Sequence, residues 1–324
     1  DEYWSGEQRA NVQAARDAGV TLSFWRGNTM FWKTRHDVGI TGDSWKTLVT
    51  YKESYDGAPS DPSNIWTGLW RDADGLSEGG GVPESALKGS NFAVNLGTPL
   101  TTIDIPHAIC GCLLWANTDV ANLQPGETWT LNGNYLGYEW DVDVLDEFRP
   151  DNLIALSETT VEVPFLLEGT NVQYSQGTAT HNMTMYRADS GALVFSAGTV
   201  FWSWALDDFH VFGPVGPYEP TPTDPNAQQA MVNLFAEMGV QPETLSYWLV
   251  PGEKSTDFYA PSSQIENVYN GISFGAGSTV TLTGTAEDTG GVVAGLEIST
   301  DGGANWEPAT VYHPLIGGKT WSYI

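Results

Sequence analysis

Carboxylates alternate along one short stretch of the sequence, where single residues separate Glu139, Asp141 and Asp143. On a strand, this spacing would place all three side chains on one face. Three negative charges held that close together favour a bound cation or a nearby arginine. The stretch therefore indicates a set of metal ligands or an acid–base pair, and a solvated loop of ordinary carboxylates is the alternative that stays open.

A histidine stands just before the strand that we predict over residues 183–187. An imidazole in that place can act as a general base, and His181 with the adjacent Asn182 can also donate a hydrogen bond to a developing oxyanion. A buried structural histidine would give the same pattern. We take His181 and Asp141 as the candidate catalytic residues, with the structural role of the histidine as the alternative.

The elements that would position these groups begin at the N-terminus. Ser5 precedes a glutamine by three residues, the spacing of a capping box, and this predicts a helix over residues 6–18 that Gly19 ends. A strand is predicted over 20–25, and a loop over 27–32 leaves it. A helix followed by a strand is typical of a wound α/β sheet. Because we predict no strand before this helix, we expect the sequence to begin partway through such a sheet. In such sheets the ligand lies at the carboxyl ends of the strands, so these loops are candidate site segments.

The next part of the chain continues this domain. We predict strands around residues 48–51, 109–115, 183–187 and 193–196. A proline-rich bridge over 213–225 excludes a helix or a central strand, and apolar residues at helical spacing predict a helix over 227–238. Cys110 and Cys112 are interpreted as small apolar residues of a buried strand, because a disulfide across one intervening residue would be strained.

The pattern changes after about residue 256. Residues 277–285 and 295–300 alternate between polar and apolar at a period of two, which predicts strands. Asp301 and the two glycines after it predict a hairpin turn between strands. This segment resembles the beginning of an immunoglobulin-like β-sandwich, and it is too short to complete one. We expect both ends of the chain to be cut from a longer protein.

Composition narrows the classes of partner. The chain has 324 residues, 40 of them acidic and 13 basic, and a net charge of −27. Nucleic acids and anionic membranes require lysine and arginine, so both are excluded as partners. Solubility or a salty habitat explains the charge, and calcium binding is the functional alternative. No run of about 18 apolar residues occurs, so we predict no membrane insertion.

Several short segments, in a fixed order, carry a resemblance to a known family. They are residues 1–5, 18–20, 27–28, 31–35, 136–141, 194–199, 202–207 and 228–233. Together they resemble the C-terminal domain of the large (beta) subunit of N,N-dimethylformamidase, and more closely its relatives in multidomain secreted bacterial proteins. The resemblance covers about residues 1–250. It implies a secreted or cell-surface location in a bacterium.

These observations together give the expected fold. Residues 1–255 should form a partial wound α/β sheet that resembles the class I glutamine-amidotransferase-like fold, with long loops rich in tryptophan and glycine and without its N-terminal part. Residues 256–324 should form a truncated, all-β immunoglobulin-like domain.

The resemblance also implies a chemistry. In the family, two tyrosines and one glutamate hold a mononuclear iron that hydrolyses a small amide. Tyr3 would align with one tyrosine and Glu139 with the glutamate, so these two are the predicted metal ligands. The second tyrosine would be expected in the loop that here contains Met30, Phe31 and Trp32, none of which suits a hard metal.

Two functions follow from the sequence. The first is a hydrolase that acts on a small amide or another C–N bond, with iron as the implied cofactor and calcium as the other candidate cation. The second is a non-catalytic extracellular module that binds glycans through tryptophan side chains, since the chain has 14 of them. The partner would accordingly be a small amide or a glycan, and self-association stays open.

Overall fold

The computed structural model describes most of the chain and divides it into two compact units. The described residues are 1–53, 60–72, 81–95, 100–109, 112–168, 172–210, 221–257, 259–289, 291, 293, 295–303, 306–312 and 319–324. Unit 1 comprises Asp1–Ile103, Asn132–Val144 and Phe148–Thr223, and unit 2 comprises Asp104–Leu131, Leu145–Glu147 and Asp224–Ile324. The predicted domain boundary after residue 255 stays a prediction.

The predicted wound α/β fold is wrong. Strands account for 30% and helices for 15% of the structure, and the strands belong to several separate sheets. Among the strand pairings described, β1 with β3 and β2 with β13 are parallel, and the others are antiparallel. Helix α1 connects β1 to β2, which lie in different sheets, so it does not form the repeated strand–helix–strand unit of a wound sheet.

Unit 1 contains the elements that surround the candidate site. In chain order they are β1 (Tyr3–Ser5), α1 (Gly6–Asp17), β2 (Leu22–Phe24), β3 (Trp32–Asp37), β4 (Thr47–Val49), α2 (Ser85–Lys88), β5 (Asn91–Val94), β8 (Trp140–Val142), β9 (Ile154–Ala155), β10 (Thr159–Glu168), β11 (Gln173–His181), β12 (Thr184–Arg187), β13 (Leu193–Ser196) and a 3-10 helix (Trp202–Ala205). Their sheets are β1-β3-β4, β2-β13-β12-β9, and a closed barrel of β10-β11-β8-β5.

The N-terminal helix forms as its local sequence predicts. The Ser5 side chain accepts a hydrogen bond from the Gln8 backbone N–H at 3.1 Å, and Gly19 takes the left-handed conformation (φ 92°) that ends the helix. A strand that the sequence did not predict, β1, lies before the helix and pairs with β3. This pairing brings the N-terminal residues beside the loop after β2.

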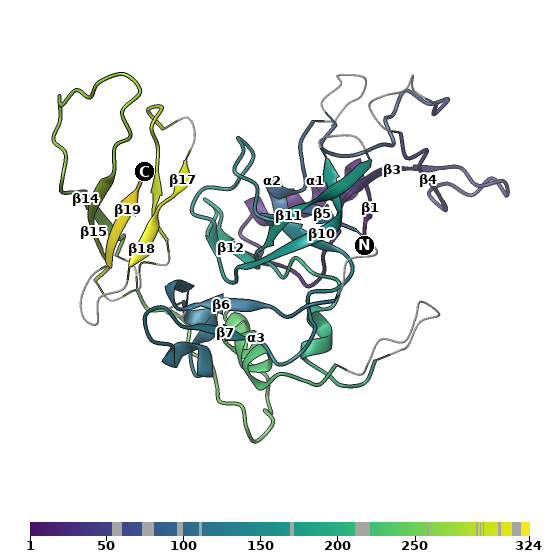
Figure 1. Cartoon of the computed structure of the whole chain (residues 1–324). Coiled ribbons are helices and arrows are strands. Elements are labelled where there is room, and N and C mark those ends of the chain that lie inside the picture. Colours follow the sequence, from purple (N-terminus) through teal and green to yellow (C-terminus); the bar gives the residue numbers. More distant parts are fainter. Residues whose placement is uncertain are drawn as a thin grey trace. The chain divides into compact units, whose positions relative to one another are not determined.

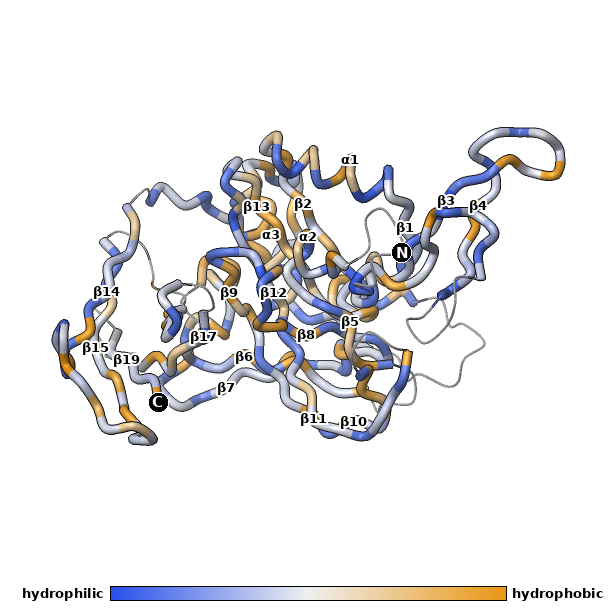
Figure 2. Tube along the Cα trace, turned by 90° about the horizontal axis from the view of Figure 1, so that it is seen from above, coloured by the Kyte–Doolittle hydropathy of each residue, from blue (hydrophilic) through white to orange (hydrophobic). Residues whose placement is uncertain are grey.

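The core of unit 1 is built from buried aliphatic and aromatic side chains around the short strands. All four residues of β13 are buried, in agreement with its hydrophobic colouring in Figure 2. Strands β5, β10 and β11 lie side by side (Figure 1), and β10 and β11 form a long hairpin. Phe92, Trp140 and Met30 are almost completely buried. This packing fixes the strand ends and loops that carry the cavity.

Unit 2 combines a small helical part with β-sheets. Its elements are β6 (Asp104–Pro106), 3-10 helices over His107–Ile109, Leu113–Trp115 and Asp119–Asn122, β7 (Thr128–Thr130), α3 (Pro225–Glu237), β14 (Ser262–Ile265), β15 (Leu282–Glu287), β16 (Glu297–Ile298), β17 (Glu307–Pro308), β18 (Thr310–Tyr312) and β19 (Lys319–Tyr323). The predicted helix over 227–238 corresponds to α3 and is confirmed. None of the helices in the described part of the chain is long and apolar enough to cross a membrane.

The strand predicted over residues 109–115 is wrong where the structure describes it. Leu113–Trp115 form a 3-10 helix, and the Asn233 side chain of α3 donates to the backbone oxygens of Leu114 (2.9 Å) and Ala116 (2.6 Å). These contacts satisfy carbonyls that a strand would have paired with a neighbour. Cys110 lies outside the described residues, and Cys112 is half-buried.

The C-terminal strands confirm the predicted hairpin but leave the domain type open. Strands β16 and β17 pair antiparallel around a turn in which Gly302 and Gly303 have positive φ. The Ser299 hydroxyl accepts from the Gly303 N–H at 2.7 Å and donates to Asp301, as a structural turn requires. Strands β14-β15-β19-β18 form an antiparallel sheet around the buried Trp321. The immunoglobulin-like identity of this part stays a prediction.

Candidate functional site

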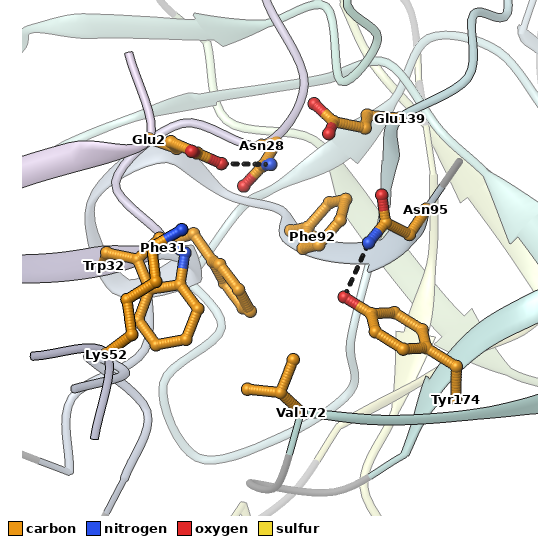
Figure 3. Close-up of a pocket in the computed structure, with 10 residues that line it drawn as sticks. All are labelled: Glu2, Asn28, Phe31, Trp32, Lys52, Phe92, Asn95, Glu139, Val172 and Tyr174. Carbon is orange, nitrogen blue, oxygen red and sulfur yellow. Dashed lines mark hydrogen bonds between the residues drawn. The ribbon is translucent and has the colours of Figure 1, made fainter. Parts of the chain in front are cut away.

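Unit 1 contains a cavity of about 500 Å³. This size falls in the range of sites that bind small molecules. The side chains around the cavity come from the residue before β1, from the loops after β2 and β4, from the start of β3, from the residue before β8, and from β5, β11 and the residues next to them (Figure 3). They are Glu2, Asn28, Phe31, Trp32, Lys52, Phe92, Asn95, Glu139, Val172 and Tyr174.

Backbone contacts bring the N-terminal segment and the loop after β2 to the same wall. The Met30 N–H donates to the Asp1 carbonyl at 3.1 Å, and the Trp32 N–H donates to the Glu2 carbonyl at 2.7 Å. A Cβ atom on Gly27 would lie 2.9 Å from the backbone oxygen of Glu139. Because that contact is too close for any side chain, a glycine is required where the loop passes Glu139.

Carboxylates and an amide share the acidic end of the cavity. The Asn28 side-chain nitrogen donates to Glu2 Oε2 at 2.8 Å, and Glu139 lies beside this pair in the cavity lining. Burial raises the pKa of Glu139 above its ordinary value; the nearby Asn28 amide opposes this rise, and the charge of Glu2 adds to it. Figure 3 shows Asn28 between the two carboxylates. This end of the cavity can accept protons and hydrogen bonds.

Aromatic rings form much of the rest of the cavity wall. The rings of Phe31 and Phe92 meet edge to face with centroids 4.9 Å apart. On the opposite side, the Asn95 side-chain nitrogen donates to the Tyr174 hydroxyl at 2.9 Å, and burial raises the pKa of Tyr174. The Lys52 ammonium lies 5.1 Å from the centre of the Trp32 ring. An apolar group bound here would face rings on several sides.

Of the two predicted metal ligands, Glu139 lines the cavity and Tyr3 does not. Tyr3 lies in β1 and packs, half-buried, against the cluster that contains Phe31, Trp32 and Phe92. Its ring lies under the Lys52 ammonium at 5.0 Å. Burial raises the pKa of the Tyr3 hydroxyl more than any other influence on it. The structure therefore places Tyr3 beside the wall of the cavity rather than in its lining.

The predicted catalytic residue Asp141 is fully buried behind the cavity wall. It pairs with the Lys88 ammonium, which is also fully buried, and it accepts from the Ser90 hydroxyl at 3.1 Å. Its other oxygen accepts from the Asn28 backbone N–H at 2.9 Å. Asn28 has a positive φ of 50°, a conformation that asparagine tolerates better than most residues. The position of Asp141 is that of a residue that holds the Asn28 turn.

The predicted catalytic residue His181 is also buried and outside the cavity lining. Its Nε2 lies 3.2 Å from the Ala197 carbonyl oxygen, and its ring meets Trp140 edge to face with centroids 5.9 Å apart. Burial lowers the pKa of His181 to about 4, so the imidazole is neutral at physiological pH. These interactions include no contact between His181 and a residue of the cavity lining. The catalytic role of His181 therefore stays a prediction.

The three alternating carboxylates make different contacts. Glu139 faces the cavity, Asp141 pairs with Lys88, and Asp143 makes two hydrogen bonds of 2.9 Å to Arg149. Within the described ranges, no three side chains of His, Cys, Asp or Glu converge as they would around a metal ion. The binding of iron or calcium therefore stays a prediction. This absence concerns His, Cys, Asp and Glu alone, so it does not cover a set of ligands that includes tyrosines.

Sequence reasoning missed several residues of the cavity. They are Glu2, Asn28, Lys52, Asn95 and Tyr174. Glu2 precedes Tyr3 and Asn28 follows Gly27, so both lie in segments that the resemblance had already singled out. No sequence pattern indicated Tyr174 or Asn95, because these two residues come together only through the pairing of β10 with both β11 and β5.

One comparison with known proteins identifies a family. The family model described as N,N-dimethylformamidase beta subunit-like, C-terminal, matches residues 1–217, which is more than half of the chain. The matched region contains every residue that lines the cavity. A search of curated proteins found no match to the chain.

Proposed function

This chain belongs to the N,N-dimethylformamidase beta subunit-like, C-terminal family, and from that premise we propose that its cavity binds a small amide and hydrolyses the amide C–N bond. One observation carries the proposal. Glu139, which the resemblance aligns with a metal-binding glutamate, lines the cavity of about 500 Å³ in the described part of unit 1. A hydrolase of this kind needs a carboxylate, a polar end for the amide and an apolar wall for its substituent, and the cavity has all three.

The donor types in the cavity fit the iron that the family implies. Glu139 offers a carboxylate and Tyr174 a phenol oxygen to the same cavity, and Tyr3 of β1 packs beside its wall. Oxygen donors of this kind suit a hard ferric ion. Tyr174 would take the place of the tyrosine that the loop at Met30 lacks. When bound, iron would polarise the amide carbonyl and lower the pKa of a water molecule.

The protein's own residues would supply the proton transfers. Glu2 keeps an acceptor oxygen beside the one that Asn28 binds, so it can take a proton from a water molecule. The water oxygen then bonds to the carbonyl carbon, the proton passes to the amide nitrogen, and the C–N bond breaks to give a carboxylic acid and an amine. The rings of Phe31 and Phe92 would exclude other water from the reacting group.

The test is release of an amine from N-benzylacetamide by the purified, iron-supplemented chain. Glu2→Gln should reduce the rate by about 100-fold or more, as expected for loss of a general base. Glu139→Gln should reduce it at least as far. Glu162→Gln, a matched change at an exposed carboxylate of β10, should leave the rate unaltered. Failure of the wild-type chain to release amine, or full activity in Glu139→Gln, would refute the proposal.

A further inference from the structure

Two aromatic side chains project from unit 2 on the segment that follows α3. Tyr247 is 95% exposed and Trp248 is 47% exposed. Their rings meet edge to face, with centroids 4.8 Å apart and ring planes at 87°. Single exposed apolar residues are common on protein surfaces, but two rings in contact form one shaped apolar surface. Covering that surface with a ligand would remove apolar area from water and so favour binding.

Hydrogen bonds to α3 hold the pair of rings in place. The Trp248 Nε1–H donates to the Gln228 side-chain oxygen at 2.8 Å, which fixes the orientation of the indole ring. The next residue of the helix, Gln229, is 3% exposed. Its amide accepts from the Val250 N–H and donates to the Val250 carbonyl oxygen, each at 2.9 Å. Because the segment is anchored on both sides of Trp248, a ligand meets rings that are already positioned, which lowers the entropy cost of binding.

The area of the two rings favours a small ligand over a protein partner. An aromatic side chain buries about 150–250 Å², so the pair covers about 500 Å² at most. Each partner of a standard protein interface buries about 800 Å². The two rings alone therefore fall short of a stable interface with a second protein or a second copy of this chain.

The other residues of the segment indicate what that ligand is. Within residues 243–249 both leucines are half-buried, whereas Glu243, Thr244 and Ser246 are exposed. The segment thus presents its aromatic rings together with hydroxyl and carboxylate groups. A sugar has C–H groups on the faces of its ring and hydroxyls around the rim. It can therefore pack on an aromatic ring while neighbouring polar groups bind its hydroxyls.

Charge and ring geometry narrow the class of sugar. The chain has a net charge of −27, and Glu243 adds a carboxylate beside the rings, so glycans that carry acid groups are repelled. Rings at 87° form a corner rather than a flat surface. Such a corner can touch one sugar on two sides, but it cannot lie flat on a crystalline polysaccharide. A β-linked glucan in solution, with C–H groups on both faces of each sugar, suits this shape.

We propose that Tyr247 and Trp248 form a binding site for neutral β-linked glycan chains in solution. One sugar of the chain packs its C–H face on the Trp248 ring and its edge on Tyr247, while the polar groups of residues 243–246 bind its hydroxyls. The site goes beyond the proposed hydrolase function and does not depend on it, because all its residues belong to unit 2. It would attach the protein to a glycan.

The experiment is calorimetric titration of the full chain with cellohexaose, a neutral β-1,4-linked glucan. We expect binding that added salt leaves unchanged, because the ligand has no charge. The β-1,4-linked hexamer of glucuronic acid, which has the same linkage and length but six carboxylates, should bind at least about 10-fold more weakly at low salt. Absence of cellohexaose binding, or tighter binding of the acidic hexamer, would overturn the proposal.

Variants assign the binding to the two rings. Tyr247→Ala and Trp248→Ala should each weaken cellohexaose binding by about 10-fold. Tyr269→Ala removes a single ring that is 74% exposed elsewhere in unit 2, and it should leave the affinity unaltered. Unaltered binding in Tyr247→Ala, a variant whose highly exposed side chain the fold does not need, would contradict the assignment. A wild-type dimer that Tyr247→Ala separates in sedimentation would assign the rings to a second copy and would also overturn the proposal.

Discussion

Replacement of Asp141 by asparagine should destabilise unit 1 strongly, although the two side chains have nearly the same shape. Asp141 and Lys88 are both fully buried, and they form an ion pair. Removing one partner of such a pair leaves an uncompensated charge and costs about 3–5 kcal/mol. The asparagine oxygen can still accept from the Asn28 N–H, so most of this cost comes from Lys88. We expect a loss of about 4 kcal/mol in the free energy of unfolding.

Urea unfolding followed by tryptophan fluorescence measures this loss. The double variant Lys88→Met with Asp141→Asn should recover much of the stability, so the two changes should couple by about 2 kcal/mol or more. Asp43→Asn removes the partner of Lys46 in an exposed pair and should cost less than about 1 kcal/mol. A loss below about 1 kcal/mol in Asp141→Asn, or simple additivity in the double variant, would refute the reasoning.

Three further predictions concern the loop, the buried histidine and the metal. Gly27→Ala should cost about 1–3 kcal/mol and displace the loop from Glu139, because its Cβ would lie 2.9 Å from backbone; unchanged urea unfolding would contradict this. Burial lowers the pKa of His181 from 6.5 to about 4, so the unfolded state takes up a proton at a higher pH than the folded state does. The free energy of unfolding should therefore fall by about 3 kcal/mol between pH 6.5 and 4, and His181→Gln should lose this dependence on pH. Ferric iron should give a visible tyrosinate absorption band that Tyr174→Phe removes, and a band unchanged by that variant would contradict the ligand assignment.

The sequence predicted local structure well and the global fold badly. The capping pattern at Ser5 and the helical spacing in 227–238 both correspond to helices, because each depends on residues a few positions apart. The helix-then-strand order of α1 and β2 misled the fold assignment. Strand β2 does pair in parallel, but its partner is β13, which lies far along the chain. No local pattern distinguishes that arrangement from a wound sheet.

Like the fold, the candidate site was predicted only in part from the sequence. Glu139 was found because it lies in a segment that resembles the family. Asp141 and His181 were chosen for their residue types, and only the tertiary structure shows that both are buried outside the cavity lining. Asn28 could not be assigned, because its place in the cavity lining depends on contacts with Asp141 and Glu2, which only the packed structure shows.

A crystal structure with N-benzylacetamide tests the central claim most directly. We predict that the amide binds in the cavity of unit 1, with its carbonyl group at the Glu139 end. The benzyl ring should lie against Phe31 and Phe92. An amide bound at another place on the protein, or a cavity that stays free of it at saturating concentration, would contradict the account.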